Sequence, residues 1–320
     1  MISSEVPVPD LRSLGLTFLS GCLLLGSGAL LAGTGNRTDA PATLPGTQAF
    51  VLASPETGRD YLIQVAVPRR QPPAEGYPVL YVLDGNARFA LTLAARDTLF
   101  SGSPADLPSP WLIVAIGYPG TDRFDTDARA EDYTPPAQRL DDTGDPNNSP
   151  QGGAERFLAF LEARLKPAIA DRFPIDARRS ALLGHSYGGL FTLYTLLEHP
   201  GAFRDYIAIS PSLWWNRGYL LERLTRLDRN LAGRRLLIGV GGEEQSPRPG
   251  EPPEKSRRRQ ANAMVDNARA AADHLRRNVP GLSVQFICFP GEDHGTVVWP
   301  AMRAALTRLH DGEVMAGGCE

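Results

Sequence analysis

Six short, mostly apolar runs constrain the fold of this chain more than any other feature of its sequence. They span residues 77–83, 111–116, 179–183, 206–209, 235–240 and 283–289. A run that is apolar at consecutive positions is typical of a strand buried on both faces, as in a parallel sheet. Helix-like segments lie between several of the runs, for example at 155–173 and 256–278. The pattern therefore predicts an α/β fold, a three-layer sandwich in which helices cover both faces of a mostly parallel central sheet.

One of the polar segments that follow these runs has a pattern typical of a nucleophile. Residues 184–188 read Gly-His-Ser-Tyr-Gly, between the run at 179–183 and a helix-like run at 190–197. In a G-x-S-x-G elbow the serine occupies a strained turn between a strand and a helix, and glycines are needed because a Cβ would clash with neighbouring backbone. A five-residue pattern of this kind also occurs by chance in chains of this length, so the strand and the helix around it carry the prediction. It identifies Ser186 as the candidate nucleophile.

A serine hydroxyl needs a base to remove its proton, and His294 is the candidate. It is the one of five histidines that follows a strand-like run in a Gly-Glu-Asp-His-Gly turn. The acid that orients the imidazole is expected between the serine and the histidine in the chain. Glu244 is the preferred acid, Glu243 at the same strand end is the alternative, and a Ser-His dyad without an acid is a third arrangement. Asp293 is interpreted as a turn residue.

The oxyanion that forms when an ester is attacked needs preorganised N–H donors. The backbone N–H of Tyr187, the residue after the candidate nucleophile, supplies one donor in an elbow. The second donor is expected from the turn after the run at 77–83, at Gly85 or Asn86. An ordinary turn is the alternative interpretation of that segment.

The bulk composition limits the classes of protein and partner. The 320 residues are 42% hydrophobic and carry a formal net charge of −3, which suits one globular α/β domain and argues against a nucleic-acid-binding surface. No metal-ligand motif and no cofactor motif is present, so neither a metal nor a cofactor is expected. Cys288 is interpreted as a buried thiol or as one half of a disulfide with Cys319.

The N-terminal segment is interpreted as a targeting element. Residues 14–33 contain no charged residue, which is typical of an export signal or of a membrane anchor, and Cys22 lies in a lipobox-like pattern. We expect an export signal or a membrane or lipid anchor at 1–33, a linker at 34–47 and the catalytic domain at 48–320. The protein is then exported, either soluble or anchored through its N-terminal segment.

Four motifs occur in the order of a known family. They are Tyr-Pro-Val-Leu-Tyr-Val-Leu-Asp-Gly-Asn at 77–86, Gly-His-Ser-Tyr-Gly-Gly-Leu-Phe at 184–191, Ser-Pro-Ser-Leu-Trp-Trp-Asn at 210–216 and Pro-Gly-Glu-Asp-His-Gly-Thr-Val at 290–297. With them the chain resembles the esterase D-type α/β-hydrolases, especially the periplasmic enterochelin esterases, over about residues 48–310. The resemblance implies cleavage of ester bonds in a cyclic catecholate siderophore. It also implies that Ser186 is the nucleophile, His294 its base and Glu244 the position of a triad acid, although some relatives work with a dyad.

A ferric tris-catecholate is a bulky trianion, so its pocket is expected to offer cations and flat apolar surfaces. The candidates are Arg129, in a segment at 120–153 that is expected to be a long loop, and Trp214 and Trp215 after the run at 206–209. Each has a structural alternative: at least one of the tryptophans can belong to the core. The arginines at 257–259 are interpreted as a solvated helix face. The acidic neighbours with which Arg129 can alternatively pair are Asp125, Asp127 and Asp132.

The expected partner is a small-molecule ester, namely an anionic ferric siderophore, and not a nucleic acid. Two alternative functions stay open at this point. The first is a general exported carboxylesterase acting on acetyl, feruloyl or small acyl esters. The second is a hydrolase fold that binds a ligand or partner without catalysis.

Overall fold

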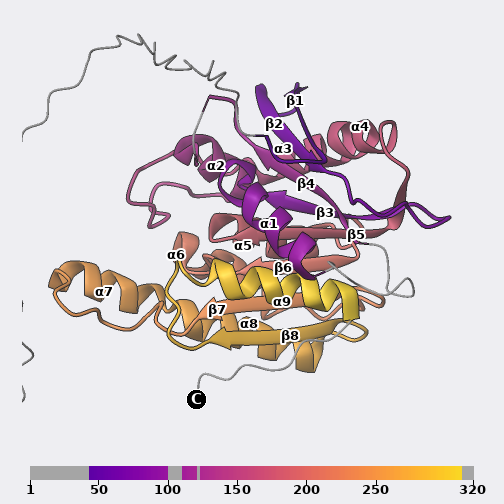
Figure 1. The fold of residues 1–320 in the computed structure, drawn as a ribbon. Coiled ribbons are helices and arrows are strands. Elements are labelled where there is room, and N and C mark those ends of the chain that lie inside the picture. Colours follow the sequence, from indigo (N-terminus) through magenta and orange to yellow (C-terminus); the bar gives the residue numbers. More distant parts are fainter. Residues whose placement is uncertain (1–42, 100–109, 121–122, 312–320) are drawn as a thin grey trace, which may run out of the picture. The chain divides into compact units, whose positions relative to one another are not determined.

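The strands form one eight-stranded sheet in the order β1-β2-β4-β3-β5-β6-β7-β8 (Figure 1). The computed structural model describes residues 43–99, 110–120 and 123–311. β1 and β2 pair antiparallel, β2 also pairs antiparallel with β4, and β3 to β8 run parallel to one another. The predicted α/β fold with a mostly parallel sheet is confirmed. The strands are β1 Thr47–Ser54, β2 Arg59–Ala66, β3 Tyr77–Leu83, β4 Leu112–Gly117, β5 Ile175–His185, β6 Asp205–Ile209, β7 Arg235–Gly241 and β8 Ser283–Phe289.

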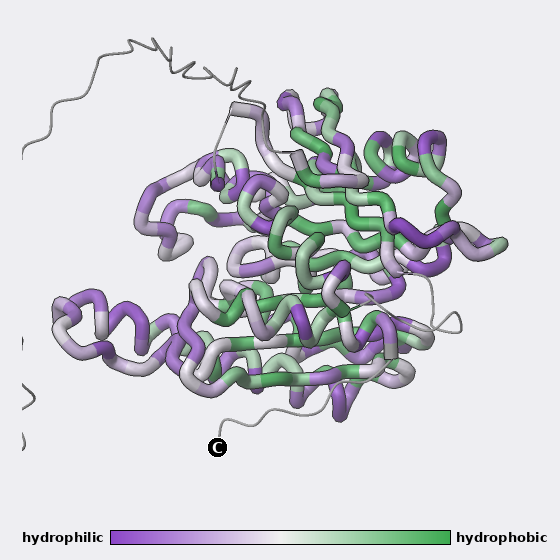
Figure 2. Tube along the Cα trace, in the orientation of Figure 1, coloured by the Kyte–Doolittle hydropathy of each residue, from purple (hydrophilic) through white to green (hydrophobic). Residues whose placement is uncertain are grey.

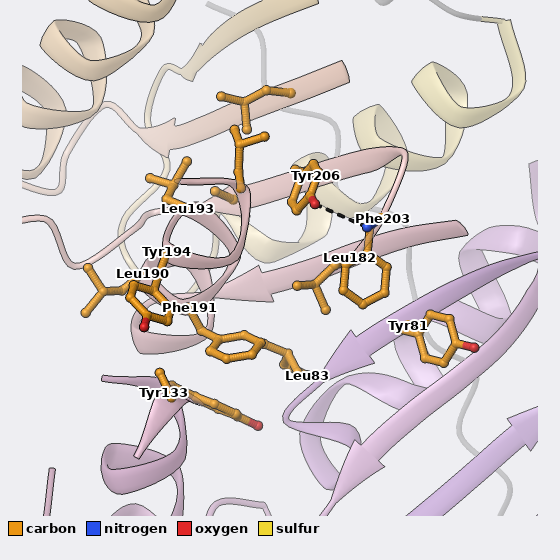
Figure 3. Packing of buried hydrophobic residues seen from close by; sticks show 14 of the residues in the cluster. Tyr81, Leu83, Tyr133, Leu182, Leu190, Phe191, Leu193, Tyr194, Phe203 and Tyr206 are labelled. Atoms are coloured by element: carbon orange, nitrogen blue, oxygen red, sulfur yellow. Dashed lines mark hydrogen bonds between the residues drawn. The ribbon is translucent and has the colours of Figure 1, made fainter. Parts of the chain in front are cut away.

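Helices cover both faces of this sheet, because successive strand side chains point to opposite faces. Tyr81 and Leu83 of β3 pack in one apolar cluster with residues of α2 to α6 and α8, whereas Leu80 and Val82 pack in the other with α1 and α9. Figure 2 shows the strands of the sheet mostly green, and Figure 3 shows how aromatic side chains such as Phe191 fill the first cluster. The helices are α1 Gly85–Leu99, α2 Thr126–Tyr133, α3 Ala154–Phe160, the π-helical turn η1 Leu161–Leu165, α4 Lys166–Ala170, α5 Tyr187–Glu198, α6 Trp215–Leu224, α7 Pro253–Asn262, α8 Met264–Asn278 and α9 Val298–Asp311.

Two helices expected as continuous are interrupted. The helix expected at 155–173 contains the π-helical turn η1, which ends two residues before Pro167. The proline removes a backbone donor, and a π turn accommodates the lost bond. The helix expected at 256–278 is divided into α7 and α8 at Ala263, whose φ of 45° and ψ of 44° are left-handed. A helical pattern in the sequence does not reveal such single-residue breaks.

Several sequence predictions fall outside the described residues. The expected export or anchor segment at 1–33 and most of the linker at 34–47 belong there, and so does Cys319, the partner of Cys288 in the alternative that pairs them. Within the described ranges no helix has the length and apolar character needed to cross a membrane. The same ranges contain no group of three or more His, Cys, Asp or Glu side chains arranged to hold a metal ion.

The segment at 120–153, expected as a loop, contains α2, and Asp132 fastens that helix to the sheet. Its buried carboxylate accepts the Tyr61 hydroxyl at 2.8 Å, the Tyr118 hydroxyl at 3.1 Å and Arg59 Nη1 at 3.2 Å. Burial raises the pKa of Asp132 from 3.8 to about 6, because desolvation outweighs the opposing effects of Arg59 and the two tyrosines. A polar hub under the segment therefore gives it order that apolar periodicity did not indicate.

Asp132 should make the stability of the fold depend on pH. Below about pH 4 Asp132 is protonated in both the folded and the unfolded state. As the pH rises from the unfolded pKa through the folded pKa of about 6, the unfolded state loses this proton first, so the free energy of unfolding falls. The loss corresponds to about 3 kcal/mol. Denaturant unfolding of wild type and Asp132→Asn between pH 4 and pH 7 measures it: the wild type should lose about 3 kcal/mol relative to the variant. Asp60→Asn, which removes an exposed carboxylate of β2, is the control, and parallel pH curves for wild type and Asp132→Asn would refute the prediction.

Candidate active site

Ser186 occupies the turn between β5 and α5, and its backbone is strained. Its φ of 61° and ψ of −119° lie outside the regions preferred by residues with a side chain. The Ser186 N–H donates to the Ile209 carbonyl oxygen at 3.0 Å, and the Leu190 N–H donates to the Ser186 carbonyl oxygen at 3.0 Å. These bonds tie the turn to β6 and to the first turn of α5, so the surrounding structure holds the serine in its unusual conformation.

Glycines on both sides of Ser186 allow the strand and the helix to approach each other. A Cβ on Gly184 would overlap the carbonyl oxygen of Gly188, and a Cβ on Gly189 would lie 2.8 Å from the Ile209 carbonyl oxygen. Close contact of backbone with backbone therefore requires glycine at 184 and 189, whereas a Cβ on Gly188, the second glycine of the motif, would meet only side-chain atoms, at 3.4 Å and beyond.

His294 and Glu244 form a hydrogen-bonded pair beyond the ends of β8 and β7. His294 Nδ1 lies 2.7 Å from Glu244 Oε2. The second carboxylate oxygen, Oε1, accepts the Gly241 N–H at 2.7 Å and also accepts the Ser210 hydroxyl. Because a carboxylate accepts, Nδ1 carries the proton of this bond, and Nε2 of the neutral imidazole is left as an acceptor. The pair therefore presents an imidazole that can take up a proton at Nε2.

Of the two glutamates that follow β7, Glu244 is the one beside the histidine. Its side chain is 0% exposed, whereas Glu243 is exposed and uses its N–H to bond the Glu292 carbonyl oxygen at 3.0 Å. The sequence left Glu244, Glu243 and a dyad as alternatives. The geometry places a carboxylate at His294, and that carboxylate belongs to Glu244.

Ser186 and His294 line one cavity of about 260 Å³ at the carboxyl end of the sheet. Ser186 Oγ lies 3.4 Å from Ser212 Oγ, and Trp214 and Glu244 also belong to the lining. A molecule in this cavity can contact the serine hydroxyl and the histidine together. The remaining wall is formed by Lys255, Arg258, Arg259, Asn262 and Met264 from α7 and the start of α8.

The predicted N–H donors for an oxyanion lie in the first turns of two helices. Tyr187 is the first residue of α5, and Gly85 and Asn86 are the first two of α1. The N–H groups of a first helical turn have no partner inside the helix. β3 and β5 are neighbours in the sheet, and a Cβ on Gly188 would lie 3.7 Å from Asp84 Oδ2, so the two turns are adjacent.

The side chain of Asn86 holds its own turn in place. It donates from Nδ2 to the Tyr118 carbonyl oxygen at 3.0 Å and accepts the Tyr118 N–H at 2.8 Å. A Cβ on Gly85 would lie 2.9 Å from the Ile116 carbonyl carbon. The turn therefore packs directly on β4 and is more constrained than an ordinary surface turn.

Arg129 lies on α2, not in a loop, and it pairs with an acid that the sequence did not indicate. Its guanidinium forms two bonds with Asp84, from Nε to Oδ1 at 2.8 Å and from Nη2 to Oδ2 at 2.9 Å. Burial acts to lower the pKa of Arg129, but the Asp84 carboxylate outweighs it and raises the pKa. The described residues that line the Ser186 cavity do not include Arg129. The alternative in which Arg129 pairs with its nearer acidic neighbours is wrong, and the prediction that Arg129 contacts a substrate is not supported by the lining of this cavity.

The two tryptophans separate. Trp214 lines the cavity, and its ring lies 6.1 Å from the Tyr187 ring. Trp215 is 0% exposed and its Nε1 donates to Gln151 Oε1 at 2.7 Å. Trp215 is therefore a core residue, which corrects its assignment as a substrate-binding residue. Adjacent positions at a helix start point in different directions, so only one of the pair can reach the cavity.

His185, the motif residue before the serine, supports the backbone of His294. Arg88 Nη2 lies 3.3 Å from His185 Nδ1, and His185 Nε2 lies 2.8 Å from the His294 carbonyl oxygen. A guanidinium can only donate, so Nδ1 accepts and Nε2–H donates to the carbonyl. Burial, reinforced by the neighbouring His294 and arginine charges, lowers the pKa of His185 well below its usual value. His185 is thus neutral, and it bridges the elbow to the histidine turn.

Sequence reasoning missed the α7 side of the cavity. The arginines at 257–259 were expected to be a solvated face, yet Arg258 and Arg259 line the cavity. Their segment follows β7, as Glu244 does, and this shared strand end was the available signal. Ser210 and Ser212 were missed as well, although both follow β6 at the same edge of the sheet.

Known proteins resemble the chain over most of its length. A protein-family model described as "Putative esterase" matches residues 54–310. The ferri-bacillibactin esterase BesA of Bacillus subtilis is 36% identical over 299 residues, which cover 89% of this chain and 97% of that protein. The siderophore hydrolase EstB of Aspergillus nidulans has a TM-score of 0.74 at 30% identity, covering 88% of this chain and 99% of that chain. The enterobactin hydrolase IroE in complex with DFP has a TM-score of 0.63 at 30% identity, covering 83% of this chain and 95% of that chain.

The elbow geometry predicts a large loss of stability for Gly184→Ala. The added Cβ overlaps the Gly188 carbonyl oxygen, and backbone must move to relieve the overlap, at a cost of about 2–3 kcal/mol. Urea unfolding measures the change in the free energy of unfolding. Gly201→Ala is the matched control, since no atom lies within 4 Å of a Cβ at that position, and it should change stability by no more than about 0.5 kcal/mol. Equal stability of the two variants would show that the elbow tolerates a side chain.

Proposed function

Because the chain belongs to the putative esterase family, we propose that it cleaves the ester bonds of a ferric catecholate siderophore trilactone such as enterobactin, with Ser186 as nucleophile, and so aids iron release. The comparisons make it a carboxylic ester hydrolase of the siderophore esterase type. The observation that carries the mechanism is one cavity lined both by Ser186 and by an imidazole that a buried glutamate holds. A relative in complex with DFP, an organophosphorus reagent for serine hydrolases, supports the choice of a serine.

In the first half-reaction His294 Nε2 takes the proton of Ser186 as Oγ attacks the ester carbonyl carbon. The new C–O bond converts the carbonyl oxygen to an oxyanion, which the N–H of Tyr187 and that of Gly85 or Asn86 stabilise. One such donor is typically worth about 3 kcal/mol. The bond to the alcohol oxygen then breaks, His294 returns its proton to that oxygen, and an acyl-enzyme remains.

In the second half-reaction a water molecule replaces the alcohol. His294 removes a proton from the water as its oxygen attacks the acyl carbon, and the protonated imidazole then donates to Ser186 Oγ as the acyl bond breaks. Each cycle adds one water to one ester bond. Glu244 stabilises the protonated imidazole and holds its Nδ1–H, and it changes no bond itself.

The character of the cavity supports an anionic, aromatic substrate. The ferric tris-catecholate carries three negative charges, and the cavity wall offers Lys255, Arg258 and the ring of Trp214. Cations and aromatic faces are the groups that bind such anions. BesA and IroE are named for ferri-bacillibactin and enterobactin, which supports the siderophore class without choosing the member.

Export is part of the proposal. Its support is the uncharged stretch at residues 14–33, which suits a cleaved signal or an anchor. A periplasmic enzyme would meet the ferric siderophore after its uptake through an outer membrane.

Product analysis tests the proposed reaction. The wild type, incubated with ferric enterobactin, iron-free enterobactin and 4-nitrophenyl butyrate, should convert enterobactin to species heavier by one water for each ester cleaved, as seen by mass spectrometry. Ser186→Ala should lower the rate by at least about 10³-fold. Ser212→Ala, which removes the hydroxyl 3.4 Å away, should lower it by no more than about tenfold.

Two results would contradict this proposal separately. Hydrolysis of the simple ester alone would reject the siderophore as substrate. Full activity of Ser186→Ala would reject Ser186 as the nucleophile.

A further inference from the structure

Helix α7 forms a second wall of the Ser186 cavity, and its side chains differ in chemistry from those at the sheet edge. The sheet edge contributes Ser186 and His294, whereas α7 contributes three cationic side chains and Asn262. The cations are Lys255, Arg258 and Arg259. The bond-making and bond-breaking steps above use no residue of this helix.

One of the three cations is neutralised by a carboxylate in the loop before α7. Arg259 forms an ion pair with Glu251, and their side chains are 13% and 6% exposed. The pair holds the start of α7 to the loop before it. Arg259 therefore has a structural partner and is not free to neutralise a ligand.

Lys255 and Arg258 are the cations that stay available. Both are exposed, and neither forms an ion pair within the described ranges 43–99, 110–120 and 123–311. Two nearby carboxylates are already engaged: Glu251 bonds Arg259, and Glu244 bonds His294. Glu254, the residue before Lys255, is exposed and does not line the cavity. The cavity wall thus has two positive charges beside the proposed nucleophile that form no ion pair among the described residues, and Lys255 adds only a smaller part to the lowering of the Glu251 pKa that Arg259 dominates.

The build of α7 indicates that these charges, and not apolar packing, are its contribution. None of its residues is buried, and it lies at the margin of the fold as a polar segment (Figures 1 and 2). Pro252 precedes it, Pro253 is its first residue, and the left-handed Ala263 ends it. A helix that contributes nothing to the core, but places cations in the cavity, is suited to bind a ligand.

We infer that Lys255 and Arg258 form an anion subsite that binds the negatively charged part of the ester substrate while its carbonyl is at Ser186. The subsite rests on the proposed function and names its specificity: esters that carry phenolate or carboxylate groups are preferred over neutral esters. For a ferric catecholate trilactone the subsite neutralises part of the charge of the metal complex. The same charges attract the anion from solution, an effect that salt screens.

Charge reversal tests the subsite with a control on the same helix. Arg258→Glu and Lys255→Glu change lining residues, whereas Arg257→Glu makes the same change at an exposed position that does not line the cavity. The measured quantity is the ratio of kcat/KM for an anionic ester to kcat/KM for a neutral one. Two pairs are used: ferric enterobactin against 4-nitrophenyl butyrate, and 4-acetoxybenzoate against its methyl ester.

The ratio should fall by about tenfold or more in Arg258→Glu and Lys255→Glu at low salt, and the effect should shrink in about 0.5 M NaCl. Arg257→Glu should change it by less than about threefold. Equal effects of Arg257→Glu and Arg258→Glu, or unchanged ratios in both lining variants, would overturn the subsite. Circular dichroism checks that each variant is folded, and Arg258→Gln replaces Arg258→Glu if that variant is not.

The two substrate pairs keep this inference distinct from the proposed function. In one outcome the wild type fails to cleave ferric enterobactin, while Arg258→Glu and Lys255→Glu still lower the kcat/KM ratio of 4-acetoxybenzoate to its methyl ester. That result rejects the siderophore as substrate and supports the subsite. Cleavage of enterobactin with ratios unaffected by either lining variant supports the siderophore and rejects the subsite.

Discussion

The hydrogen bond between the buried Glu244 carboxylate and His294 is the interaction on which the rest of the site depends. A carboxylate with a side chain 0% exposed is costly unless each oxygen has partners. Glu244 obtains them from three strand ends: Ser210 after β6, Gly241 at the end of β7 and His294 after β8. The parallel order β6-β7-β8 brings these groups to one edge. The sheet thereby positions the Glu244 carboxylate, and this carboxylate sets both the position of the histidine and the imidazole nitrogen that carries the proton.

The nucleophile is held by a second, independent set of constraints. Ser186 keeps a strained backbone because β6 and α5 bond its peptide groups, and because Gly184 lets α5 begin in contact with β5. His185 connects the two sets, since it donates to the His294 carbonyl oxygen. The chemistry is thus built from rigid strand ends. By contrast the wall that faces it, α7, has no buried residue, which separates the groups that react from the groups proposed to select the substrate.

Much of this could be predicted from the sequence, and the parts that could not share a physical cause. Continuous apolar runs identify buried strands, and their polar ends meet at one edge, so Ser186, His294 and Glu244 could be grouped without coordinates. Side-chain direction and partner choice depend on tertiary contacts instead. Trp215 and Trp214 are adjacent, yet one is core and the other lines the cavity; Arg129 reaches Asp84 across 45 positions of sequence. Apolar periodicity did not predict helix α2, because the residue that fixes it to the sheet, Asp132, is polar. A helical pattern also does not show the break at Ala263, a single left-handed residue, that separates α7 with its cavity-lining residues from α8.

The rate at which a fluorophosphonate labels Ser186 tests most directly the claim that Glu244 organises the site. Peptide mass mapping identifies the labelled residue, and the second-order rate constant is compared between wild type, Glu244→Gln and the exposed neighbour Glu243→Gln. The account predicts labelling at Ser186, a decrease on the order of 10³ to 10⁴-fold in Glu244→Gln, and a change below about threefold in Glu243→Gln. Wild-type labelling of Glu244→Gln, or a larger loss in Glu243→Gln, would contradict it.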